Sequence, residues 1–318
     1  MAEKPVRSWP RRLGRIALWV AGALLLAALA LIVSIPIAGI GSEERLNDIT
    51  NETIPGTAGG PDVRAWVAYP PAHLTPEGAP VKRPVVVMIH EFWGLNESIV
   101  SKANLLATEG YVVIAPDVMR GSTTQWVPRA IYQVATTPPA QINADLDSVM
   151  AWARSQPDVD AERIAIVGFC FGGRTSMLYS LHDPTLEGTV VFYGNPPLDA
   201  ARLAALEGPV LGIFGGADVS IPLEDVAAFE AALDEAGVEN TVTVYPDQPH
   251  AFVTSAEGIA TDPVQREAWN EMAGFLGSAL ASPTAGAARP QPADDPLGWT
   301  YLARLAWSHA APGAHAGH

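Results

Sequence analysis

The sequence predicts an α/β fold in which helices cover both faces of a mostly parallel sheet. Two observations support this prediction. Short, continuous apolar runs recur along the chain, and segments with helical periodicity lie between them. A continuous apolar run is typical of a strand buried on both faces, as in a parallel sheet. Alternation with helices indicates crossover connections that pack against the sheet.

The strands are predicted from these runs. The first buried strand is expected at Arg83–His90, which reads RPVVVMIH, and a shorter alternating strand precedes it at Val63–Pro70. The other expected strands are Tyr111–Pro116, Arg163–Gly168, Thr189–Gly194, Pro209–Gly215 and Thr241–Tyr245.

The helices are predicted from apolar residues that recur at intervals of three or four. Ile142, Leu146 and Val149 share one face in this way. The expected helices are Asn96–Glu109, Gln141–Arg154, Leu223–Ala236 and Pro263–Leu280. Together with the strands, they predict one α/β domain over residues 44–281, because its length suits a single domain.

An uncharged segment, Ile16–Ile40, precedes this domain. A helix needs about 20 apolar residues to cross a bilayer, whereas a secretory signal has an apolar region of only ~7–15 residues. The sequence therefore predicts a single transmembrane helix over residues 16–40. The basic segment 1–15 would stay in the cytoplasm and the body would lie outside it. A cleaved signal peptide and a buried core helix are the alternatives.

Composition excludes several classes of function. The formal net charge is −15 although the first fifteen residues are basic, so the body is acidic and a nucleic-acid partner is not expected. A single cysteine excludes an intramolecular disulfide and a multi-cysteine metal site. Residues 282–318 are rich in Ala, Pro and Gly, which predicts a low-complexity tail containing one short aromatic helix candidate, GWTYLARLAWSHA.

That cysteine, Cys170, follows the predicted strand Arg163–Gly168 in the segment GFCFGG. The order of strand, glycine, cysteine, glycine and helix matches a nucleophile elbow, in which a sharp turn presents the nucleophile at the carboxyl end of a sheet. The turn also places the thiol at a helix N-terminus, where the helix dipole favours a thiolate. A cysteine that only fills the core is the alternative for the isolated motif.

Two further residues follow in the chain order of an α/β-hydrolase, which is nucleophile, acid and base. Asp218 comes just after the predicted strand Pro209–Gly215, and His250 lies in the loop after Thr241–Tyr245. Both therefore fall at strand carboxyl ends, where open α/β sheets build their sites. The three residues together predict a catalytic triad of Cys170, Asp218 and His250.

Glu91 follows the predicted strand Arg83–His90, in the segment HEFWGLN. This is the loop that supplies part of the oxyanion hole in hydrolases of this type. The segment does not continue as H-E-x-x-H, because Gly94 stands where the second histidine would be. A zinc protease is therefore excluded.

In combination, the motifs HEFWGLN, YVVIAPD, GFCFGG and GGADVSIP followed by PHAF resemble the dienelactone hydrolase family over about Asp48–Leu280. The resemblance implies that Cys170 is the nucleophile and that Asp218 orients His250, the general base and acid. It also implies that Glu91 pairs with the resting thiol and helps to form the thiolate when substrate arrives.

The resemblance further implies oxyanion donors at the backbone N–H groups of Phe92 and Phe171, and no cofactor or metal. The residues expected to line the substrate pocket are Trp93, Arg120, Tyr193, Phe252 and Thr254. The expected activity is cleavage of a small ester or lactone through an acyl-enzyme. A tethered, non-catalytic binding or sensing protein is the alternative.

Two features depart from the family pattern. Thr254 stands where the type enzyme has an arginine that holds a substrate carboxylate, and the spacing around Arg120 differs from that of the family's other carboxylate-binding arginine. A membrane anchor is also unusual for a family known best from soluble cytoplasmic enzymes. The ester-cleaving residues are therefore expected to be retained, while a carboxylate-bearing substrate is not.

Overall fold

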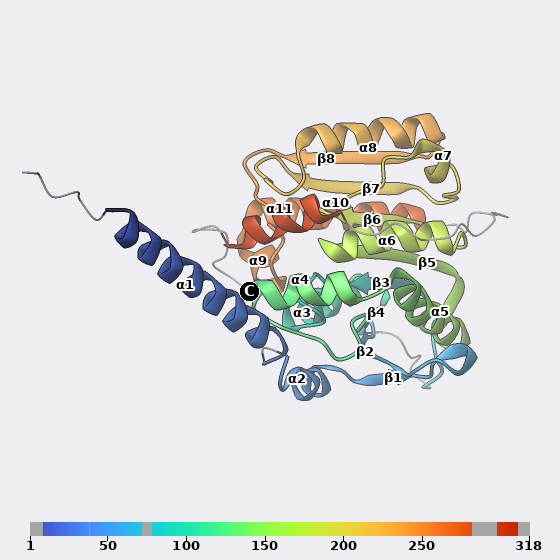
Figure 1. Ribbon diagram of the computed structural model, residues 1–318. Coiled ribbons are helices and arrows are strands. Elements are labelled where there is room, and N and C mark those ends of the chain that lie inside the picture. Colours follow the sequence, from blue (N-terminus) through green and yellow to red (C-terminus); the bar gives the residue numbers. More distant parts are fainter. Residues whose placement is uncertain (1–8, 38, 72–77, 282–297, 311–318) are drawn as a thin grey trace, which may run out of the picture. The chain divides into compact units, whose positions relative to one another are not determined.

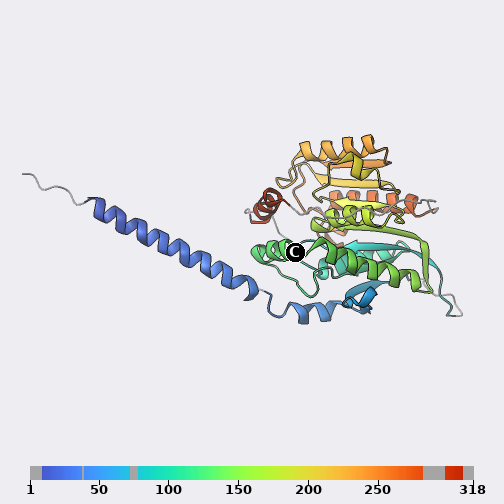
Figure 2. The same cartoon turned by 45° about the vertical axis from the view of Figure 1, so that its right-hand side comes forward.

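The computed structural model describes residues 9–37, 39–71, 78–281 and 298–310, and divides into two compact units after Ile40. In the first unit, α1 (Trp9–Ile37) is a continuous helix, coloured blue in Figure 2, with Pro36 in its last turn. By length and composition it could cross a membrane, with a mean hydropathy of 2.8 over 18 residues that are not buried. A signal sequence meets the same criterion.

The second unit is built on an eight-stranded sheet in the order β1-β2-β4-β3-β5-β6-β7-β8 (Figure 1). The pairs β1–β2 and β2–β4 are antiparallel, and every other pair is parallel. The strands are β1 (Glu52–Ile54), β2 (Val63–Ala68), β3 (Arg83–Ile89), β4 (Val112–Pro116), β5 (Val159–Phe169), β6 (Thr189–Phe192), β7 (Val210–Gly215) and β8 (Asn240–Tyr245).

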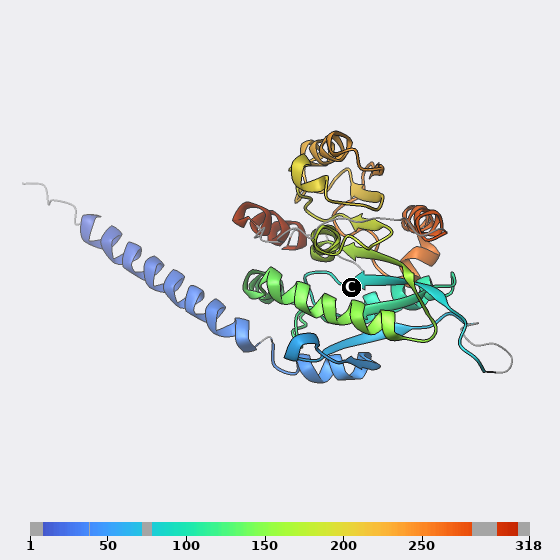
Figure 3. The same ribbon diagram turned by 90° about the vertical axis from the view of Figure 1, so that its right-hand side faces the viewer.

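Helices cover both faces of the sheet, as the alternating pattern predicts. Figures 1 and 3 show α5 and α6 on one face and α3 and α10 on the other. The helices of this unit are α2 (Ser42–Ile49), α3 (Glu97–Ala107), α4 (Val127–Thr136), α5 (Pro139–Ser155), α6 (Phe171–His182), α7 (Ala200–Leu203), α8 (Leu223–Ala236), α9 (Ala256–Thr261), α10 (Pro263–Ala279) and α11 (Trp299–Ala310), with a 3₁₀ turn, η1 (Thr57–Gly59).

The core lies on both sides of the central strands, where Val85, Val86 and Val87 are completely buried. The register of the parallel strands also decides which loops meet. Ile89 at the end of β3 pairs with Gly168 near the end of β5, and Gly215 at the end of β7 pairs with Tyr245 at the end of β8. Each of these strands is followed by a predicted site residue, so those residues lie together at the carboxyl ends of the parallel strands.

The predicted tail contains one of these helices. The aromatic segment proposed as a short helix is α11, and it packs into the second unit with four buried side chains. The rest of the predicted tail, residues 282–297 and 311–318, lies outside the described residues, as do residues 1–8 of the basic segment.

Candidate active site

The turn between β5 and α6 consists of one residue, Cys170. Its backbone has φ 56° and ψ −114°, which a side-chain-bearing residue adopts at a cost of about 1–3 kcal/mol. Its N–H donates to the carbonyl oxygen of Phe192 at 2.9 Å, which fixes the turn against β6. The side chain is completely buried and is not in a disulfide. The strand-to-helix turn therefore has the backbone of a nucleophile elbow.

The glycines on either side of Cys170 allow the strand and the helix to approach closely. A Cβ atom on Gly168 would lie 2.0 Å from the carbonyl oxygen of Gly172, and one on Gly172 would lie 2.3 Å from the carbonyl oxygen of Ile89. Neither distance is compatible with a side chain. The local sequence GFCFGG is therefore required by the packing of α6 on β3 and β5.

The loops after β7 and β8 bring Asp218 and His250 into contact. Nδ1 of His250 lies 2.6 Å from Oδ2 of Asp218, and both side chains are almost completely buried. Ser220 completes the arrangement, because its Oγ donates to Oδ1 of Asp218 at 2.6 Å and lies 3.0 Å from Nδ1 of His250. With Nδ1 held on this side, Nε2 is the ring nitrogen left for chemistry.

The pair holds a charged imidazole favourably. Burial opposes the charge on His250, but the negative charges of Asp218 and Cys170 outweigh burial and raise the pKa of His250 well above its usual value. Burial likewise opposes ionisation of Asp218. The pKa of Asp218 is nevertheless lowered, because His250 contributes its charge and a hydrogen bond and Ser220 contributes further hydrogen bonds. The arrangement therefore favours an imidazolium beside the Asp218 carboxylate.

Cys170 acts electrostatically on His250. The charge on its sulfur and a hydrogen bond to it are among the causes of the raised pKa of His250. Nε2 of His250 has no hydrogen-bond partner among the described residues. Hydrogen bonds at catalytic sites are often long in the absence of a ligand and tighten with substrate bound.

Glu91, directly after β3, is a buried carboxylate that is 1% exposed. Neither of its oxygens has a hydrogen-bond partner among the described residues. The charge of Glu91 acts on two buried neighbours. Burial lowers the pKa of Lys102, and the charge of Glu91 opposes this effect. Burial raises the pKa of Tyr193, and the charge of Glu91 adds to this effect. Such an unpaired carboxylate is costly and is typical of functional sites.

The two predicted oxyanion donors lie at well-defined backbone positions. Phe171 is the first residue of α6, so its N–H has no acceptor within the helix. Phe92 lies in the turn after β3, where its carbonyl oxygen accepts a hydrogen bond from Nε2 of Gln133 in α4. This bond fixes the peptide plane beside the Phe92 N–H.

Three predicted pocket residues are buried close to the triad. The ring of Tyr193 packs edge-on against His250 at a centroid distance of 5.3 Å and against Phe252 at 5.7 Å. Trp93 contacts the ring of Phe92 at 4.3 Å. Tyr193 and Phe252 therefore form a buried aromatic cluster with His250, whereas Trp93 packs on Phe92.

The other two predicted pocket residues are engaged elsewhere. Arg120 makes an ion pair with Asp145 of α5, with an N–O distance of 2.8 Å. The hydroxyl and N–H of Thr254 both donate to the side chain of Gln265. In this conformation neither residue is directed to a substrate carboxylate.

Three residues of the site could not be identified from the motifs alone. Ser220 lies two residues after Asp218, and its spacing is the one available signal, since a short polar residue there can bond the aspartate. Gln133 and Lys102 lie on helices far from the site in sequence, and only the packing of α4 and α3 brings them in. Across the described ranges, no group of three or more His, Cys, Asp and Glu side chains is arranged to hold a metal.

The fold and the site define an α/β-hydrolase. Cys170, Asp218 and His250 follow β5, β7 and β8, and this is the chain order of nucleophile, acid and base in that fold. The chain belongs to the dienelactone hydrolase family, whose model matches residues 71–280. It is therefore a hydrolase of the dienelactone hydrolase type, acting on esters or lactones.

Similar proteins agree with this assignment. A Salmonella typhimurium protein named "Putative carboxymethylenebutenolidase" is 37% identical over 227 residues, covering 67% of this chain and 82% of the relative. A crystal structure titled "Putative Dienelactone Hydrolase", from Klebsiella pneumoniae, superposes with a TM-score of 0.61 at 32% identity, covering 71% of this chain and 96% of that one. A propionate-bound esterase from Thermogutta terrifontis, at 16% identity and a TM-score of 0.54, covers 75% of this chain and 96% of its own and shows the same fold.

Proposed function

We propose that the protein cleaves a small, uncharged ester or lactone through a Cys170–His250–Asp218 triad and a covalent acyl-enzyme. The observation that carries this proposal is the position of Cys170. It is the single residue between β5 and α6, its backbone is strained, and its charge is among the causes of the raised pKa of His250, which a buried aspartate holds at Nδ1. Strain of this kind is retained where the surroundings require it, typically at active sites.

In the first step, the thiol proton of Cys170 passes to Nε2 of His250 and the sulfur attacks the carbonyl carbon of the substrate. The C–O π electrons move to the oxygen, which the N–H groups of Phe92 and Phe171 stabilise. Donors of this kind contribute about 3–4 kcal/mol each to the transition state. When the tetrahedral intermediate collapses, the C–O bond to the leaving group breaks. Nε2 of His250 gives its proton to the departing alkoxide, which leaves as an alcohol or, from a lactone, stays attached as a hydroxyl.

In the second step, water hydrolyses the thioester. Nε2 of His250 accepts a proton from the water as its oxygen attacks the acyl carbon. The C–S bond then breaks, the acid is released, and the sulfur leaves as a thiolate beside the imidazolium. Asp218 keeps Nδ1 protonated through both steps. Glu91 assists thiolate formation when substrate is present.

The environment of the site supports an uncharged substrate. A buried carboxylate must be paired, or its desolvation opposes binding. Arg120 is already paired with Asp145, and Thr254 offers no cation. The chain's net charge of −15 also gives anionic substrates no long-range attraction.

Substitution of the nucleophile tests this function. Cys170→Ala should lower turnover of p-nitrophenyl acetate by at least about a thousandfold while the far-UV CD spectrum stays unchanged, because the attacking atom is removed with little change in volume. Ser220→Ala is the matched control, because Ser220 contacts the unreactive side of His250 and should keep most of the activity. Activity that survives in Cys170→Ala and disappears in Ser220→Ala would contradict the thiol mechanism.

We also propose that α1 anchors the enzyme in a membrane, with residues 1–15 in the cytoplasm and the hydrolase outside. The length and hydropathy of α1 support a span, and the arginine-rich end supports this orientation.

A further inference from the structure

The C-terminal helix α11 lies beyond residues 71–280, which match the family. It packs beside α4 and reaches α8, where Arg304 lies 3.9 Å from Asp225. One face of the helix is buried, formed by Tyr301, Leu302, Leu305 and His309. The opposite face carries Trp307, which is 70% exposed. The helix is therefore held by its apolar face against the catalytic unit.

The buried face of α11 contacts the reaction centre. The ring of His309 lies 5.3 Å from that of His250, 4.5 Å from Phe92 and 5.4 Å from Trp93, measured between centroids. These neighbours are the general base and the loop that carries a proposed oxyanion donor. The C-terminal end of α11 thus covers the site beside the triad.

Tyr301, two turns earlier, lies on the same buried face of α11 as His309. It is 3% exposed, and its hydroxyl has no partner within ordinary hydrogen-bond distance among the described residues. Burial, followed by negative charge on Cys170, raises the pKa of Tyr301 well above its usual value. The hydroxyl therefore stays protonated and is a neutral donor.

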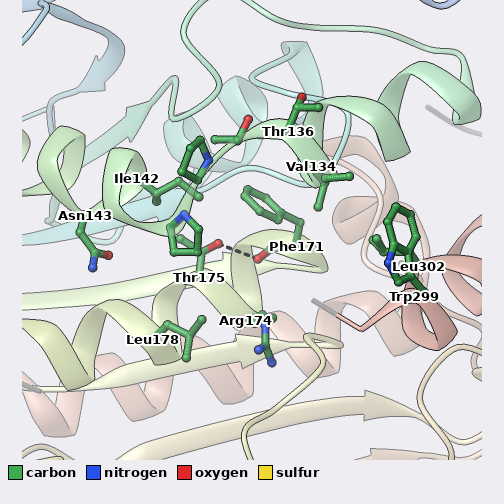
Figure 4. A pocket seen from close by; sticks show the side chains of 14 residues that line it. Val134, Thr136, Ile142, Asn143, Phe171, Arg174, Thr175, Leu178, Trp299 and Leu302 are labelled. Carbon is green, nitrogen blue, oxygen red and sulfur yellow. Dashed lines mark hydrogen bonds between the residues drawn. The ribbon is translucent and has the colours of Figure 1, made fainter. Parts of the chain in front are cut away.

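A cavity of about 400 Å³ is lined in part by Phe171, the residue after Cys170 (Figure 4). Phe171 lies in the middle of the view, and Leu302 and Trp299 of α11 lie on one side of it. The opposite wall comes from α4, α5 and α6 and is mainly apolar, with Val134, Ile142 and Leu178. A cavity of this size is typical of sites for small ligands.

We propose that α11 is a working part of the active site. Leu302 closes an apolar pocket that receives the acyl group of the substrate, and Tyr301 donates a hydrogen bond to the sulfur of Cys170 while that sulfur is negatively charged. This inference rests on the proposed thiol mechanism and names the substrate feature that the same site selects. The acyl group is the occupant because it stays attached to Cys170 after the alcohol leaves, and the adjacent residue, Phe171, lines the cavity.

Tyr301 acts at the steps in which the sulfur of Cys170 is negatively charged. The donor stabilises the thiolate before attack and again when the C–S bond breaks in the second step. Loss of a hydrogen bond to a charged group should therefore slow turnover without weakening the binding of a neutral ester.

The test uses the full-length chain in detergent and p-nitrophenyl esters that differ only in acyl length. Tyr301→Phe should lower kcat for the acetate ester about tenfold, with KM changed by less than about twofold. Leu302→Ala should raise the ratio of kcat/KM for the hexanoate ester to that for the acetate ester about tenfold, because it enlarges the pocket. Trp307→Ala, on the exposed face of α11, is the control and should match the wild type in both measurements.

The possible outcomes separate this inference from the function on which it rests. If Cys170→Ala is inactive but either Tyr301→Phe or Leu302→Ala behaves like Trp307→Ala, the role of α11 is overturned while the thiol mechanism stands. If Cys170→Ala keeps its activity, the thiol mechanism itself is wrong. Should Leu302→Ala not fold, the smaller change Leu302→Val gives the same comparison.

Discussion

At the scale of single residues, the site contains two buried groups of opposite charge that make no ion pair. Nζ of Lys102 and both oxygens of Glu91 have no hydrogen-bond partner among the described residues. Nζ lies 4.3 Å from the centroid of the Phe169 ring, so a cation–π contact stabilises part of its charge. The charge of Glu91 favours the charged form of Lys102 against burial. We interpret Lys102 as the counter-charge that allows Glu91 to stay buried.

This interpretation predicts non-additive effects on stability. Lys102→Met should lower the free energy of unfolding by about 3 kcal/mol, because the buried carboxylate loses its counter-charge. Adding Glu91→Gln should recover part of that loss, since the remaining groups are neutral. Denaturant unfolding of both single variants and the double variant gives the coupling energy. Additive effects would show that the two groups do not interact.

The triad predicts a pH dependence of stability. The raised pKa of His250 contributes stability fully below about pH 6.5, its unfolded value, and the contribution is lost as pH rises through the folded pKa. The lowered pKa of Asp218 contributes stability above about pH 4, and this is lost as pH falls through its folded pKa. The pair is therefore most stabilising between about pH 4 and 6.5.

Asp218→Asn removes the charge that both shifts depend on. The difference in melting temperature between wild type and this variant should be largest between about pH 4 and 6.5 and should shrink on either side. Thermal denaturation across the pH range measures it. A difference that stays constant from pH 4 to 9 would mean that the His250–Asp218 pair is not ionised as described.

At the scale of elements, the elbow depends on the close contact of β5 and α6. Gly168→Ala should lower the free energy of unfolding by ~3 kcal/mol or more, because its Cβ would lie 2.0 Å from a backbone oxygen that cannot move away. Gly274→Ala in α10 is the control, since no atom lies within 4 Å of its Cβ. It should raise stability by about 0.5–1 kcal/mol. If denaturant unfolding gave the same change in the free energy of unfolding for both substitutions, a steric clash at Gly168 would be excluded as the cause.

The elements that the sequence predicts are those with a strong local pattern. The strands from β3 to β8 fall within a few residues of their predicted bounds, because apolar and β-branched runs favour a strand. β1 has only three residues, and α2, α7 and α9 are short, so none contains enough repeats to give a clear periodic pattern. β5 begins earlier than predicted, at Val159, because pairing with Arg83 extends it through polar residues.

The site follows the same division. Cys170, Asp218 and His250 could be placed from motif order, since each directly follows a strand. The long-range partners could not be placed in that way. The ion pair of Arg120 with Asp145, the bond of Gln133 to the Phe92 carbonyl and the approach of Tyr301 depend on how helices distant in sequence pack, which local periodicity does not encode.

At the scale of the whole molecule, the chain combines an exposed apolar helix with a hydrolase that has its own core. The exposed large apolar residues of the described chain are concentrated in α1. Contiguous apolar surface of this extent is unfavourable in water and indicates a membrane-spanning helix or a signal sequence that is later cleaved. The two possibilities differ in whether residues 1–40 remain attached to the mature enzyme.

An uncleaved anchor predicts both a topology and a mature N-terminus. A reporter that is active only outside the cytoplasm, fused after His318, should be active, whereas a reporter that needs the cytoplasm should not. The basic end of α1 should stay in the cytoplasm, so the chain that follows α1 should lie on the other side of the membrane. Deletion of residues 1–40 is the control and should reverse both results.

The enzyme should sediment with membranes and resist extraction by high salt, because its attachment is hydrophobic rather than electrostatic. Sequencing of the membrane-bound protein should give the original N-terminus, whereas a mature chain that begins near Gly41 would identify α1 as a signal sequence.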